Sequence, residues 1–214
     1  PIIHNGVDFD TIERSSNDEN VELILEDLGI GEKDKVVGSV FRIVEEKNPE
    51  LWIEVASKVI SELDNTHFII VGGGVQLELM RENVQRMGIG DRVHLVGQST
   101  DIASWLKRMD LFFLTSRVEG LPNVLIEAQG FGVPVISTDA GGSSETFIDG
   151  VTGYLISNED KEEISREIID WLNRSKKWLD NSSANSIGNA RKKFSTETMY
   201  EKLIEIYRMS QSGD

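Results

Sequence analysis

Short apolar runs alternate with longer amphipathic stretches along most of this chain. The apolar runs are bounded by turn residues and have the length and composition of buried strands. They predict strands at residues 35–41, 67–71, 92–96, 111–114, 133–137 and 153–156, the last at an edge of the sheet. Between them, apolar residues at helical spacing predict helices at about residues 20–28, 49–63, 75–87, 101–107, 162–172 and 196–207.

This alternation predicts an α/β fold in which successive strands are parallel and joined by right-handed crossovers. We expect a Rossmann-like sheet of about six strands with helices on both faces. Residues 1–8 have the pattern of a strand end running into a turn, and residues 143–145 that of a brief helix. Residues 181–185 are rich in turn-forming side chains and receive no assignment.

The composition of the chain excludes several classes of protein and of binding site. The chain has 214 residues, enough for one large domain with a sizeable core. Its formal net charge of −15 argues against binding to nucleic acid or to anionic membrane surfaces. It contains no cysteine, which excludes disulfides and thiolate metal sites and fits a cytoplasmic protein. No membrane-length apolar run or signal peptide is visible, and a first residue of Pro1 suggests a fragment.

The stretch around residues 116–128 carries the clearest candidate chemistry. A buried strand leads through a loop into a helix for which Pro122 suits the first position. The backbone N–H groups of Asn123 and Val124 would then be free at the helix N-terminus, where they attract anions such as phosphate. Two carboxylates, Glu119 and Glu127, flank this position.

Other polar or flexible residues also follow directly after predicted strands. Ligands of parallel sheets bind outside the carboxyl ends of the strands, so side chains from these positions converge on one rim. Cations there stabilise the negative charge of a diphosphate without a metal ion. A single nucleotide site is therefore predicted from Arg42, Lys47, Gly73, Gln98, Glu119 and Asn123. His4 and His94 are interpreted as packing residues without a chemical role.

The spacing from Glu119 to Glu127 resembles the E-x7-E signature of the retaining glycosyltransferases of family 4, which have the GT-B fold. The similarity continues through residues 128–136 and 139–145 and extends from Pro1 to about Ile156. The pairing of Arg42 with Lys47, five residues later, also matches the family pattern. One departure is that Asn48 follows the lysine where the family commonly has glycine, which leaves the conformation of that loop open.

The resemblance implies roles for individual residues. Arg42 and Lys47 would hold the diphosphate, Glu127 the ribose hydroxyls and Glu119 the hydroxyls of the donor sugar. Glu145 belongs to the family pattern and is interpreted as a helix cap or part of the site. The implied catalytic residues are Glu119, Arg42 and Lys47, and the implied donor-binding residues are Gly73, Gln98, Gly120, Leu121, Asn123, Val124 and Glu127.

The resemblance also implies an activity and an organisation. It implies a retaining glycosyltransferase that moves a sugar from a nucleotide-sugar to a saccharide or lipid-linked acceptor. Residues 41–49 and 119–129 resemble those of bacterial capsule, Vi-antigen and exopolysaccharide transferases, which points to a UDP-sugar. The nucleotide-sugar is a substrate, so no cofactor is expected. The resemblance implies no metal either, because fixed cations take the place of a metal ion at the diphosphate.

Residues 1–214 would then form one nucleotide-sugar-binding domain, with 1–15 linker-like and 195–214 a C-terminal helix. The acceptor domain would lie N-terminal to this chain, and the chain alone would be inactive. We expect the full-length protein in the cytoplasm, peripheral to the inner membrane, with its membrane contact outside this domain. Two alternatives remain, a GT-B sugar-nucleotide epimerase and a non-catalytic nucleotide-binding module. Donor sugar, linkage and oligomeric state stay open.

Overall fold

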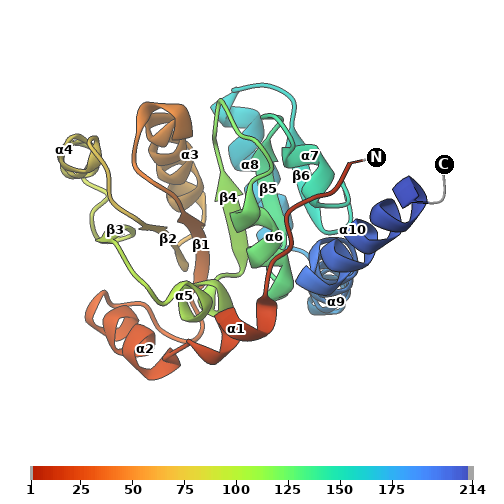
Figure 1. The fold of residues 1–214 in the computed structure, drawn as a ribbon. Helices are drawn as coiled ribbons and strands as arrows, with labels where there is room; N and C mark the ends of the chain where they lie inside the picture. Colours follow the sequence, from red (N-terminus) through yellow and green to blue (C-terminus); the bar gives the residue numbers. More distant parts are fainter. Residues whose placement is uncertain (1, 212–214) are drawn as a thin grey trace.

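A computed structural model describes residues 2–211. Its centre is a parallel six-stranded sheet in the order β3-β2-β1-β4-β5-β6 (Figure 1). The strands are β1 (Lys35–Val40), β2 (Thr66–Val71), β3 (Val93–Gly97), β4 (Leu111–Leu114), β5 (Val135–Thr138) and β6 (Gly153–Ile156). This confirms the predicted strands, their parallel pairing and the edge position of the last one.

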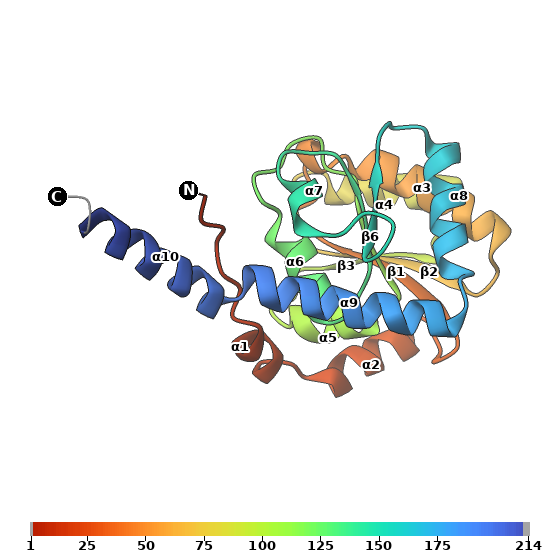
Figure 2. The ribbon, with the colours of Figure 1, turned by 90° about the vertical axis from the view of Figure 1, so that its right-hand side faces the viewer.

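Helices cover both faces of the sheet, as predicted. Figure 2 shows α3 and α8 on one face and α2, α5 and α9 on the other, with α10 extending away from the body. The helices are α1 (Phe9–Arg14), α2 (Asp18–Asp27), the 3₁₀ turn η1 (Glu45–Lys47), α3 (Pro49–Glu62), α4 (Leu77–Met87), α5 (Ile102–Arg108), α6 (Asn123–Gly130), α7 (Ser143–Thr146), α8 (Lys161–Leu172), α9 (Lys176–Phe194) and α10 (Thr196–Gln211).

The core lies between the central strands and the flanking helices. Strands β2, β4 and β5 are buried along their whole length, as expected of parallel strands covered on both faces. Trp52 of α3 is fully buried, meets Phe68 of β2 edge-on at a centroid distance of 5.4 Å and stacks on Phe113 of β4 at 6.2 Å. Its indole N–H donates to the Ser39 hydroxyl at 2.7 Å, so these two buried polar groups are paired with each other.

Two local expectations were wrong, and one helix was not predicted. Pro122 is the N-cap of α6 rather than its first residue, with ψ of 97°. The strand end predicted in residues 1–8 is only an isolated bridge between Val7 and Ser195, and Pro1 lies outside the described residues. Residues 9–14, without a predicted element, form α1, which docks through the buried Phe9.

The turn-rich residues 181–185 lie inside helix α9. Of these residues, Ser182 is buried and Ser183 half-buried, whereas Asn181, Ala184 and Asn185 are exposed. Ser182 is buried and its hydroxyl donates to the Val151 carbonyl at 2.7 Å. Tertiary packing here overrides a weak local helix propensity.

Candidate functional site

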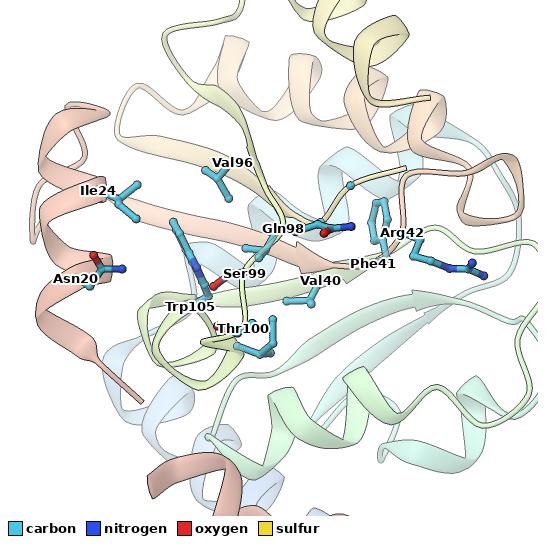
Figure 3. A pocket seen from close by; sticks show the side chains of 14 residues that line it. Asn20, Ile24, Val40, Phe41, Arg42, Val96, Gln98, Ser99, Thr100 and Trp105 are labelled. Carbon is cyan, nitrogen blue, oxygen red and sulfur yellow. The ribbon is translucent and has the colours of Figure 1, made fainter. Parts of the chain in front are cut away.

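An open cleft of about 800 Å³ lies at the carboxyl ends of β1, β2 and β3. Arg42 marks one end of it, and Asn20, Ile24 and Trp105 lie at the other, with Gln98 between them (Figure 3). The structure therefore brings together three predicted site residues from three different strand ends, namely Arg42, Gly73 and Gln98.

Helices α2 and α5 form the far side of this cleft, which the sequence did not indicate. They contribute Asn20, Ile24, Ile102 and the almost fully buried Trp105. Their apolar side chains follow the helical pattern of core residues, and no local signal separates a cleft-lining residue from a core residue. The end of the cleft at Arg42 and Gln98 is thus polar, whereas the end under α2 and α5 combines Asn20 with apolar side chains.

The loops around the rim are joined by backbone contacts. The Ile43 N–H donates to the Gly73 carbonyl at 2.9 Å, which connects the loop after β1 to the loop after β2. The fit is close, because a Cβ added at Gly72 would lie 1.9 Å from the Phe41 carbonyl oxygen. Gly72 also has a φ of 151°, which favours glycine. These glycines serve the approach of one loop to another.

Lys47 and Glu119 form an ion pair beside this rim. The Lys47 side chain is 20% exposed and that of Glu119 is 11% exposed, so the pair is largely shielded from water. The Ser116 hydroxyl also donates to the Glu119 carboxylate at 2.6 Å, a contact not expected from the sequence. Two of the three predicted catalytic residues thus meet, although they are 72 positions apart in the sequence.

Helix α6 starts directly after the loop that carries Glu119. Among the residues that the structure describes, the Asn123 and Val124 N–H groups have no hydrogen-bond acceptor. Glu127, one turn further, is half-buried, and burial raises the pKa of its carboxyl above the usual value. We find no hydrogen-bond donor for this carboxylate within residues 2–211. An anion-attracting helix end therefore lies beside a carboxylate with free acceptor capacity.

Gly120 and Leu121 join the site to the loop after β5. The Gly142 N–H donates to the Gly120 carbonyl at 2.6 Å, and a Cβ on Gly141 would meet the Glu119 carbonyl oxygen at 2.0 Å. Gly120 is exposed, which leaves its backbone open to a ligand.

Glu145 has a different contact from the helix cap considered for it. Its carboxylate lies 3.0 Å from the His4 Nε2, and its own carbonyl accepts a hydrogen bond from the Lys193 ammonium at 2.6 Å. It therefore connects α7 to the N-terminal segment and to α9.

Comparisons with known proteins add an independent line of argument. The family model described as "Glycosyl transferases group 1" matches residues 20–210. A Vi polysaccharide biosynthesis protein, VipC/TviE, of Salmonella typhi is 47% identical over 125 residues, which cover 58% of this chain and 22% of that protein. The capsular polysaccharide biosynthesis glycosyltransferase CapM of Staphylococcus aureus is 28% identical, over 95% of this chain and 52% of CapM.

Among solved structures, Anabaena Alr3699/HepE in complex with UDP and glucose superposes with a TM-score of 0.83 at 22% identity. The match covers 97% of this chain and 56% of that protein. This likeness confirms the predicted Rossmann-like fold. This chain thus spans about half the length, or less, of the proteins it matches. Within residues 2–211, no helix is both long and apolar enough to cross a bilayer.

Proposed function

Because this chain belongs to the glycosyl transferases group 1 family and has the fold of GT-B enzymes, we propose that it binds the donor in a retaining glycosyltransferase. The Lys47–Glu119 pair carries the proposal. It places a cation and a carboxylate together at the sheet rim, beside the free N–H groups of α6. A cation, a carboxylate and a helix N-terminus are the groups needed to hold a sugar diphosphate.

The cations act on the diphosphate. Arg42 at the polar end of the cleft and Lys47 hold its oxygens, with help from the Asn123 and Val124 N–H groups. As the glycosidic bond breaks, the departing nucleoside diphosphate gains negative charge, and these donors stabilise that charge. A metal ion is not required for this step.

The carboxylates act on hydroxyl groups. Glu127 has free acceptor capacity one turn along α6 and receives hydrogen bonds from the ribose. Glu119 lies before the helix and accepts hydrogen bonds from the hydroxyl groups of the donor sugar once Lys47 turns to the phosphates. Gly120 and Leu121 offer backbone groups to the same sugar. Gly73 and Gln98 line the cleft towards α2 and α5, where the base lies.

The relatives support a donor class and a process. The Anabaena structure holds UDP and glucose, and the Salmonella and Staphylococcus relatives are named for Vi and capsular polysaccharide biosynthesis. We therefore propose a UDP-sugar donor and a saccharide or lipid-linked acceptor in bacterial polysaccharide synthesis. The acceptor and the membrane contact belong to a domain N-terminal to this chain in a cytoplasmic protein, so the chain alone binds the donor without transferring sugar.

Calorimetry on this chain tests the proposal. We expect UDP to bind more tightly than uridine, and Lys47→Ala to remove a charge-assisted contact of about 1.5–3 kcal/mol from UDP only. Lys58→Ala is the control, because Lys58 also pairs with a glutamate, Glu162, but on α3 and α8 away from the rim. Equal weakening of UDP and uridine by Lys47→Ala would show that Lys47 does not contact the phosphates.

A further inference from the structure

Asn48, the residue after Lys47, has a conformation that few side chains adopt. Its φ of 50° and ψ of 52° are left-handed, and it is the one non-glycine residue with positive φ among those that the structure describes. Asparagine tolerates this region better than most residues, although glycine adopts it more readily. The backbone must reverse here because the strand β1 and η1 lead directly into α3, which begins at Pro49.

Asn48 is held from several sides. It is 3% exposed, its N–H donates to the Glu45 carbonyl at 2.9 Å, and its carbonyl accepts from the Thr115 hydroxyl at 3.1 Å. Its side-chain Oδ1 accepts a hydrogen bond from Nη2 of Arg117 at 3.1 Å. The side chain thus contacts the loop that carries Glu119.

The Asn48 amide also carries a cost. Its Nδ2 is buried without an acceptor among the residues that the structure describes. A glycine at this position would keep the left-handed backbone and bury no unpaired amide. Local stability therefore does not account for an asparagine here, and the bond to Arg117 is the contact that a glycine would lack.

Arg117 fixes the other side of the same loop. Its backbone N–H donates to the Glu46 carbonyl at 2.8 Å, while its guanidinium reaches Asn48. The Thr115 hydroxyl donates to the Lys47 carbonyl at 2.9 Å. The backbone before, at and after Lys47 is consequently bonded to the loop after β4.

We propose that Asn48 is a positioning residue for Lys47. Its hydrogen bond to Arg117 holds the backbone of the loop so that the Lys47 side chain reaches a diphosphate. Asn48 itself touches no ligand. This inference rests on the proposed function, in which Lys47 contacts the diphosphate of the donor.

A double-mutant cycle with UDP tests the proposal. Asn48→Ala should weaken UDP binding by about tenfold and leave uridine binding unchanged. In a Lys47→Ala background the same substitution should weaken UDP by less than about twofold, because a residue that acts through Lys47 has nothing left to position. An equal loss in both backgrounds would overturn the proposal.

Two further variants separate the backbone from the side chain. Asn48→Gly keeps the left-handed backbone and should remain folded, yet it should still weaken UDP, because the Arg117 bond is lost. Arg117→Met should have a similar effect, and Arg81→Met, which removes an arginine on α4 paired with Glu78, should have none. If Asn48→Gly and Arg117→Met both bound UDP as the unmodified chain does, the side chain would have no positioning role.

Hydrogen exchange supplies a readout without ligand. Asn48→Gly should speed exchange of the Arg117 amide, which is bonded to Glu46, and leave amides in the middle of α3 unchanged. Failure of the unmodified chain to bind UDP would refute the proposed function, whereas unchanged exchange at Arg117 would refute the positioning role of Asn48.

Discussion

At the scale of single residues, the two glutamates of the site have different surroundings and therefore different expected roles. Glu119 is already paired with Lys47, so Glu119→Ala frees the lysine for the phosphates. We expect this variant to bind UDP as well as or better than the unmodified chain and to lose affinity for UDP-sugars. Glu127→Ala should weaken UDP and UDP-sugars by a similar factor, about fivefold or more for a lost hydrogen bond of about 1 kcal/mol.

Titration calorimetry with UDP and a panel of UDP-sugars measures both effects. Glu54→Ala, which removes an exposed carboxylate of α3 paired with Lys161, serves as the control. If Glu119→Ala weakened UDP as strongly as Glu127→Ala, the division between sugar and ribose would be wrong.

A second prediction at this scale concerns His67 and His94, which lie on β2 and β3 away from the site. His67 Nδ1 and His94 Nε2 are 3.2 Å apart, and both residues are buried. Burial, together with the neighbouring His67, lowers the pKa of His94 from 6.5 to about 4. As pH falls below 6.5, the unfolded chain takes up a proton that the folded chain does not, so stability falls until pH reaches about 4.

Unfolding in urea at pH 7 and pH 5 measures this contribution. His94→Gln should remove a pH-dependent loss of roughly 1–2 kcal/mol over that interval, since one proton is involved. Comparing the two chains at each pH removes the contributions of groups that do not interact with His94. An identical gap in unfolding free energy between the two chains at both pH values would contradict the assigned pKa.

At the scale of elements, Gln129 fixes helix α6 in place. This fully buried amide donates to the Leu125 and Thr146 carbonyls at 3.0 and 2.8 Å. Its oxygen accepts from Thr152 at 3.1 Å and Asn189 at 3.2 Å. One side chain therefore connects α6 to α7, α9 and the loop before β6.

Gln129→Met keeps the volume of the side chain and removes these bonds. We expect an unfolding free energy lower by about 2–4 kcal/mol, because several buried polar groups lose their partners. Thermal unfolding followed by circular dichroism measures the change, and Gln85→Met on the surface of α4 is the control. A loss below about 0.5 kcal/mol would show that the bonds around Gln129 are not net stabilising.

Some of these elements could be predicted from the sequence and others could not. The buried strands were found because a run such as residues 111–114 is apolar throughout and short. Helix α9 was not predicted, because Asn181, Ser182 and Ser183 favour turns in isolation and residues 181–185 received no assignment. Only the tertiary structure shows that Ser182 is paired across to Val151.

At the scale of the whole molecule, the rim was predictable because the carboxyl ends of parallel strands meet at one edge. That rule, together with the family resemblance, predicted that Arg42, Gly73 and Gln98 lie together, and the structure places them in one cleft. Contacts between loops could not be predicted from the sequence. The pairing of Lys47 with Glu119 and of Asn48 with Arg117 depends on loop geometry, which no short stretch of sequence specifies.

The close approach of Gly72 to Phe41 also bears on how this domain can diverge. No side chain fits between the two backbones at this point, so a substitution of Gly72 would displace the loops after β1 and β2 that border the cleft. On the α2 and α5 side, Asn20, Ile24 and Thr100 line the cleft with side chains, and none of them is a glycine (Figure 3). Directed evolution towards a new nucleotide base should therefore accumulate its changes on those two helices and the Thr100 loop, and leave the glycines untouched.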